Sequence, residues 1–150
     1  MRNRSIDDGR VRVPRPALVL GAAGYLPFLA LSLHAAFATA PQGELSHEML
    51  LGYGAVILSF LGGIHWGRAI AQDTPNWPVL TFGVIPSLIG WLGLAVPFNP
   101  GAMLLVSGFV FALAYDLLAT RNRDMPEWYP RLRIPLTLAV CAALLLPVAV

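Results

Sequence analysis

The chain has 150 residues, of which 57% are hydrophobic and 12% are charged, and its net charge is +2. Ordinary soluble domains carry about 25% charged residues, and a soluble fold of this size exposes too much surface to hide so many apolar side chains. Cys141 is the only cysteine, which excludes a disulfide within the chain and a metal site built from cysteines. The composition therefore predicts an integral membrane protein.

Residues 1–16 form a polar, arginine-rich segment in which Pro14 and Pro16 disfavour helix. We expect a disordered cytoplasmic tail. A signal peptide over residues 1–40, cleaved after Ala40, is the rival hypothesis. The apolar stretch exceeds the 7–15 residues of an ordinary signal core, so a retained first span is favoured.

Five apolar runs follow, and each approaches the roughly 20 residues that cross a bilayer. Ser46 is a candidate N-cap for the second span, and Asn99-Pro100 is a typical start for the fourth. The sequence predicts an all-α bundle of about five transmembrane helices. The expected spans are 17–39, 47–71, 78–96, 101–119 and 132–150.

The arginines predict the orientation, because cytoplasmic loops of membrane proteins carry an excess of basic residues. All ten basic residues are arginines, and they lie in residues 1–16, at Arg68, and in or next to the loop at 120–131. Five spans place all of them on one side of the membrane, whereas four or six do not. We expect a cytoplasmic N-terminus and a C-terminus outside.

Small residues recur every fourth position in the second span, at Ala55, Ser59, Gly63 and Gly67. Small-xxx-small spacing lets another helix approach closely. The pattern predicts a ridge that packs against a helix of this chain or of a second copy. A substrate groove is the alternative.

His65 and Arg68 lie three residues apart, so they share one face of the second span. An arginine within a span normally has a partner, and Asp116 lies near the same end of the fourth span. We predict an Arg68–Asp116 ion pair with His65 one turn deeper. The pair either locks two helices or forms a small polar pocket for an anion, a proton or a lipid head group.

The loop before the last span combines belt aromatics with arginines, at Trp128, Tyr129, Arg131 and Arg133. Aromatic residues gather at membrane interfaces, and arginines there attract anionic lipid head groups. The loop is predicted to anchor the protein to lipid; docking of a partner protein is the alternative. The sequence contains no nucleophile elbow, phosphate loop, catalytic carboxylate pair or metal-ligand cluster, so we expect no catalytic residue, no cofactor, no metal and no nucleic-acid partner.

Two stretches resemble an uncharacterised family of multi-span membrane proteins that includes mitochondrial transmembrane protein 69. They are residues 53–67 and residues 128–133 with the following Leu136-Thr137. The resemblance implies a multi-span protein of bacterial inner membranes or mitochondria and supplies no catalytic residues. Asp7 and Asp8 are unlike an acid-poor transit peptide. We therefore expect the bacterial inner membrane, or the mitochondrial inner membrane if the source is eukaryotic.

Three functions remain open from the sequence. The first is a non-enzymatic helper that packs against, assembles or stabilises a larger membrane complex, or a homo-oligomer. The second is a carrier or channel for a small solute, ion or proton that uses His65, Arg68 and Asp116. The third is an enzyme acting on lipid, for which the sequence shows no nucleophile.

Overall fold

A computed structural model describes residues 12–39, 41–71 and 77–150. These residues fold into five helices and contain no strand. All five helices are long and apolar enough to cross a membrane. This confirms the predicted all-α membrane fold. The helices are α1 (Arg15–Phe37), α2 (Gln42–Ile70), α3 (Trp77–Leu94), α4 (Phe98–Arg121) and α5 (Tyr129–Ala149).

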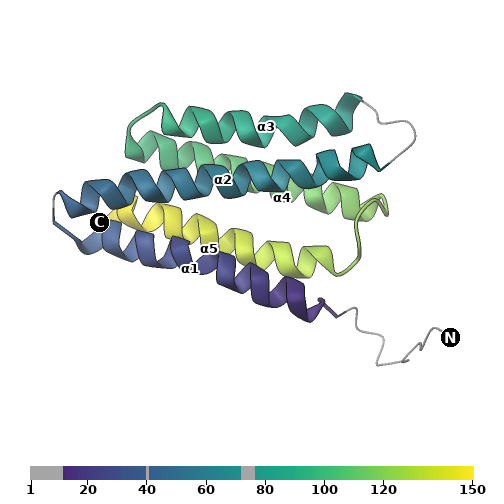
Figure 1. Cartoon of the computed structure of the whole chain (residues 1–150), viewed down its shortest axis with the longest axis horizontal. Coiled ribbons are helices and arrows are strands. Elements are labelled where there is room, and N and C mark those ends of the chain that lie inside the picture. Colours follow the sequence, from purple (N-terminus) through teal and green to yellow (C-terminus); the bar gives the residue numbers. More distant parts are fainter. Residues whose placement is uncertain (1–11, 40, 72–76) are drawn as a thin grey trace.

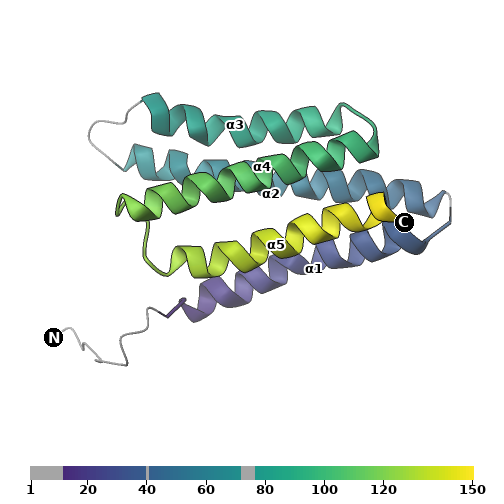
Figure 2. The ribbon, with the colours of Figure 1, turned by 180° about the vertical axis from the view of Figure 1, so that it is seen from behind.

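Successive helices run in alternate directions along the long axis (Figure 1). α1 packs against α2 and α5, and α4 packs against α2, α3 and α5, as the view from behind also shows (Figure 2). The start of α1, the end of α2 and the α4–α5 loop lie at one end of the bundle. The described arginines belong to these segments, so we call this end the arginine end. Which end faces the cytoplasm stays a prediction.

The helices begin earlier than the hydropathy pattern predicted. α1 begins at Arg15, with Pro16 in its first turn, where a proline costs nothing because its missing N–H has no helical acceptor. α2 begins at Gln42 instead of residue 47, so Ser46 does not cap it. The Ser46 hydroxyl instead lies 2.7 Å from His34 Nδ1 on α1. The predicted tail falls mostly on residues 1–11, outside the described part of the chain.

The apolar core lies between α1, α2, α4 and α5. Phe28 of α1 is at its centre, with its ring 4.8 Å from Tyr53 and 6.1 Å from Phe109. α3 contributes small residues instead of large ones: its buried residues are Gly83, Pro86, Gly90 and Gly93. The backbone of α3 can therefore approach α2 closely.

Gly63 and Gly67 do not contact another helix of this chain, so the part of the ridge prediction that placed them against a neighbouring helix of the same chain is wrong; packing against a second copy stays a prediction. Both are exposed, and a Cβ added to either would meet nothing within 4 Å. The glycine of α2 that packs tightly against α3 is Gly62, where a Cβ would meet the backbone oxygen of Gly83. A row of every fourth residue drifts by about 40° per step around a helix with 3.6 residues per turn, whereas a row of every seventh drifts by only about 20°. From Ala55, the row at intervals of seven, Ala55, Gly62 and Ala69, therefore stays buried.

Candidate functional site

Asp116 on α4 is the centre of a buried polar cluster. The residue is only 1% exposed. Its Oδ1 lies 2.9 Å from Nε2 of His65 on α2, and its Oδ2 accepts a hydrogen bond of 2.8 Å from Nε of Arg133 on α5. One carboxylate thus joins three helices.

Within this cluster, the Arg133 guanidinium and the Asp116 carboxylate carry opposite charges and form an ion pair. Removing either partner of a buried ion pair leaves an uncompensated buried charge, so the pair holds α4 and α5 together. His65 is held from its other side by Tyr115, whose ring lies edge-to-face at 4.5 Å, and Tyr115 stacks on Phe82 at 4.4 Å. The cluster therefore fixes the relative positions of α2, α4 and α5.

The predicted Arg68–Asp116 pair does not form. Arg68 Nη1 lies 3.7 Å from Oδ2 of Asp124, in the loop after α4. Position along the helices explains the difference: Asp116 and His65 each lie five residues before the end of their helix, whereas Arg68 lies only two before the end of α2. At 1.5 Å of rise per residue, Arg68 is about one turn too close to the arginine end to meet Asp116.

The predicted interfacial loop is also revised, because α5 begins at Tyr129. Tyr129, Arg133 and Thr137 then follow one another at intervals of four and share one helix face. That face points into the bundle: the three residues are 8%, 6% and 2% exposed. Of the four residues predicted at the interface, only Trp128, which is half-buried, and Arg131, which is exposed, are not buried in the bundle. Pro130, in the first turn of α5, is the sequence signal for the earlier start.

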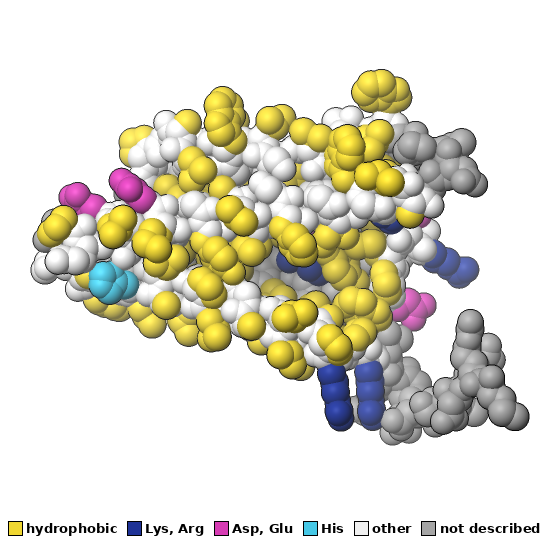
Figure 3. Space-filling view, in the orientation of Figure 1, with side chains coloured by type: hydrophobic (Ala, Val, Ile, Leu, Met, Phe, Trp, Pro, Cys, Tyr) yellow, Lys and Arg dark blue, Asp and Glu magenta, His cyan; other side chains and the backbone are white. Residues whose placement is uncertain are grey.

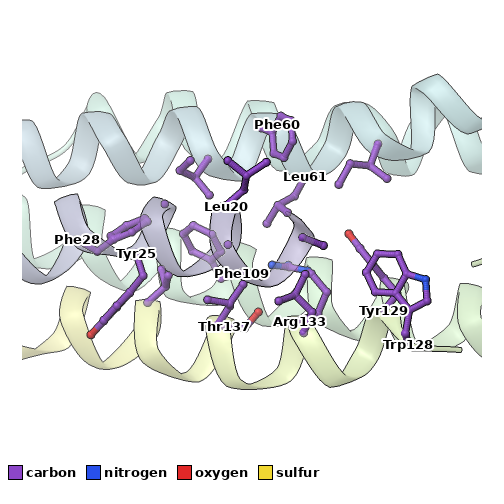
Figure 4. Close-up of a pocket in the computed structure, with 18 residues that line it drawn as sticks. Leu20, Tyr25, Phe28, Phe60, Leu61, Phe109, Trp128, Tyr129, Arg133 and Thr137 are labelled. Atoms are coloured by element: carbon purple, nitrogen blue, oxygen red, sulfur yellow. The ribbon is translucent and has the colours of Figure 1, made fainter. Parts of the chain in front are cut away.

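A groove of about 400 Å³ lies beside the cluster, between α1, α2, α4 and α5. Its walls are almost entirely apolar, and Arg133 is its only charged residue among those that the structure describes. Figure 4 shows the Arg133 guanidinium and the Thr137 side chain on the α5 side of the groove. In Figure 3, yellow side chains cover the flank of the bundle, and a basic group is visible inside a hollow between the helices. The groove thus opens on the apolar flank.

Three polar atoms of this face of α5 have no hydrogen-bond partner among the described residues: Tyr129 Oη, Arg133 Nη2 and Thr137 Oγ1. Buried polar atoms in proteins are nearly always paired. All three residues line the groove, and each can donate a hydrogen bond. The site is therefore suited to a molecule that offers acceptor oxygens next to an apolar body.

The remaining candidate chemistry is limited. In the described part of the chain, no three His, Cys, Asp or Glu side chains lie close enough together to hold a metal ion. His34 bonds to Ser46 of the neighbouring helix, at the end of the bundle opposite His65. The Cys141 thiol is free and half-buried.

The family described as "Protein of unknown function (DUF3429)" matches residues 13–149. The chain belongs to this family. Transmembrane protein 69 of Xenopus tropicalis is 38% identical over 136 residues, which cover 87% of the chain and 53% of that relative. Transmembrane protein 69 of Mus musculus is 32% identical over 130 residues, covering 83% of the chain and 52% of the relative. The chain thus spans about half the length of the curated relatives it matches, and no solved structure matches it.

These matches confirm the family resemblance predicted from residues 53–67 and 128–133, and they agree with a multi-span membrane protein. The same two stretches supply much of the site described above. His65 lies in the first, Tyr129 and Arg133 lie in the second, and Thr137 follows shortly after it. The two stretches thus contain most of the donor face of the groove and two of the three residues of the polar cluster, whose centre, Asp116, lies outside both.

Proposed function

We propose that this membrane protein binds an amphiphilic molecule in the groove between α1, α2, α4 and α5, without catalysing a reaction itself. The observation that carries the proposal is the set of three unpaired hydrogen-bond donors at Tyr129, Arg133 and Thr137 on an otherwise apolar surface. The apolar walls accommodate a hydrocarbon chain, and the donors bind the polar group at its end.

The free-energy cost of unpaired donors favours a groove that is occupied by a ligand. Leaving a buried donor unpaired costs about 1–3 kcal/mol, and the groove contains three such atoms. A ligand oxygen placed against them recovers part of that cost. A volume of about 400 Å³ is also within the roughly 300–1,000 Å³ range of small-molecule sites.

The surroundings support a membrane source for the ligand. The donors lie toward the arginine end of the bundle, where Arg121, Arg123 and Arg131 are exposed. Such arginines attract anionic head groups, and we propose that they hold this end at the cytoplasmic surface of a bacterial inner membrane, or at the equivalent surface in mitochondria. A molecule dissolved in the bilayer then reaches the groove sideways.

Help in assembling a larger membrane complex is the second candidate function. A different observation favours it: Gly63 and Gly67 are exposed on the outer face of α2 with open space around them. Glycines spaced by four allow close approach of a second helix within a membrane. The partner would be a transmembrane helix of another protein or of a second copy.

The polar pocket that the carrier or channel hypothesis requires does not form. It required His65, Arg68 and Asp116 to face one another, and Arg68 instead lies against Asp124. The side chains of His65 and Asp116 lie 2.9 Å apart, both are buried, and the Tyr115 ring packs edge-to-face on His65. We propose no path for an ion or solute through them.

The proposed function is tested by purifying the full chain from native membranes in a mild detergent and measuring the intact mass of the complex. Wild type should retain one small amphiphilic molecule per chain, and Thr137→Trp, which fills the groove, should lose it. Val56→Trp is the matched control, because Val56 is exposed on α2 and outside the groove. Equal bound mass in wild type and in Thr137→Trp contradicts the proposal, as does the absence of bound mass in wild type.

A further inference from the structure

We infer that the occupant of the groove is an uncharged ring that bears carbonyl oxygens and a long apolar tail, the chemistry of an isoprenoid quinone. This inference rests on the proposed function, and it goes further by naming the ligand class. Three features of the groove lead to it: its charge balance, the placement of its donors and the composition of its walls.

The charge balance favours an uncharged ligand. Arg133 is the only charged residue lining the groove within the described chain, and its Nε already binds the Asp116 carboxylate. A carboxylate or phosphate bound at Arg133 Nη2 would place a second negative charge beside Asp116 in an apolar medium. Two buried anions sharing one cation are costly. A carbonyl oxygen accepts the same hydrogen bond and adds no charge.

The placement of the donors favours a ligand with more than one oxygen on a rigid body. Tyr129, Arg133 and Thr137 occupy successive turns of one face of α5, so the Cα atoms of neighbouring members are about 6 Å apart along the helix axis. A ring with carbonyl oxygens on opposite edges offers two acceptors separated by a similar distance. Because a carbonyl oxygen can accept two hydrogen bonds, a ring with two such oxygens can engage all three donors.

The walls favour an aromatic or quinonoid ring with a single chain. Each of the four helices that form the groove contributes at least one aromatic side chain, and the loop before α5 contributes another. A flat ring packs well against such groups through stacked or edge-to-face contacts. Between these aromatic groups the lining is aliphatic and extends along α1 past Gly21 and Gly24. The aromatic side chains are Tyr25, Phe28, Phe60, Phe109, Trp128 and Tyr129.

The test uses three probes with the purified full chain in detergent: decylubiquinone, palmitate as an anionic single chain, and dioleoylglycerol as an uncharged ester. Binding is measured by native mass spectrometry over a range of probe concentrations. Thr137→Val and Tyr129→Phe each remove one hydroxyl that has no protein partner, so both variants should fold normally.

Ser32→Ala is the matched control. Ser32 also carries a buried hydroxyl without a partner, but it does not line the groove. We expect decylubiquinone to bind one molecule per chain. Thr137→Val and Tyr129→Phe should each weaken that binding by about threefold to tenfold, the value of one hydrogen bond, and Ser32→Ala should leave it unchanged.

Two outcomes overturn the inference, and they are distinguishable from each other. If palmitate or dioleoylglycerol binds in a manner that depends on Thr137 and decylubiquinone does not, the ligand class is wrong while the groove remains a binding site. If none of the three probes binds in a manner sensitive to Thr137 or Tyr129, the proposed function fails together with the ligand class.

Discussion

Arg133 Nε donates a hydrogen bond of 2.8 Å to Asp116 Oδ2, and this contact connects the two halves of the site. On the Asp116 side, the carboxylate holds His65 and fixes three helices. On the Arg133 side, the guanidinium reaches the groove with one nitrogen unpaired. The same arginine thus stabilises the bundle and presents a donor to a ligand.

Removing Arg133 alone should destabilise the bundle more than removing both partners. Arg133→Met leaves the Asp116 carboxylate buried without its cation, at a cost of about 3–5 kcal/mol. The double variant Arg133→Met/Asp116→Leu leaves no buried charge and should recover much of that loss. Unfolding free energies in mixed micelles provide the measurement, with exposed Arg121→Met as the control. A double variant that is less stable than Arg133→Met contradicts the ion-pair account.

Gly62 and Gly63 are adjacent in sequence, but substituting them should affect stability differently. A Cβ at Gly62 meets the backbone of Gly83, whereas one at Gly63 meets nothing within 4 Å. Gly62→Ala should therefore destabilise the fold by about 1–3 kcal/mol through overpacking, and Gly63→Ala should leave it nearly unchanged. The same unfolding assay measures both variants. Equal losses at the two positions are incompatible with the described α2–α3 contact.

Gly63→Leu tests the assembly function without disturbing the fold. Because the space around Gly63 is open, the variant should unfold like wild type. If another helix packs against this face of α2, the added side chain should abolish co-purification of a stoichiometric partner or of a second copy. Val56→Leu, at an exposed position of the same helix, serves as the control. Unchanged association in Gly63→Leu removes the support for a partner at this face.

The orientation predicted from the arginines is tested with reporters fused at the two ends of the chain. A reporter at Arg2 should be active in the cytoplasm, and one after Val150 should be active on the opposite side, because five spans separate them. Reporters that locate both ends on the same side contradict the five-span topology in the membrane.

The sequence predicted the helices well because a long apolar run is sufficient to indicate a span, whatever it packs against. It did not predict the partner of Asp116, since that depends on how far α2 and α4 extend beyond the site. Arg68 lies about one helical turn too close to the end of α2, so His65 meets Asp116 in its place. Arg133 is the second partner because α5 begins before residue 132.

The groove could not be predicted from the sequence, because it is formed by spaces between side chains of four helices. Its donor face on α5 could have been found. Starting the last helix at Tyr129, as Pro130 in its first turn indicates, aligns Tyr129, Arg133 and Thr137 at intervals of four. With the start set at residue 132, the first of these residues falls in the loop and the face is not apparent.

The central claim is that the groove contains donors awaiting a ligand oxygen, and thermal unfolding of wild type and Thr137→Val tests it most directly. Both proteins are measured in detergent, with and without added lipid extract from the native membrane. Without extract, Thr137→Val should be at least as stable as wild type, because it removes a buried hydroxyl that has no partner. With extract, a ligand that binds only the folded state raises the unfolding temperature, and the increase should be clearly larger for wild type. An equal increase in both proteins contradicts the account.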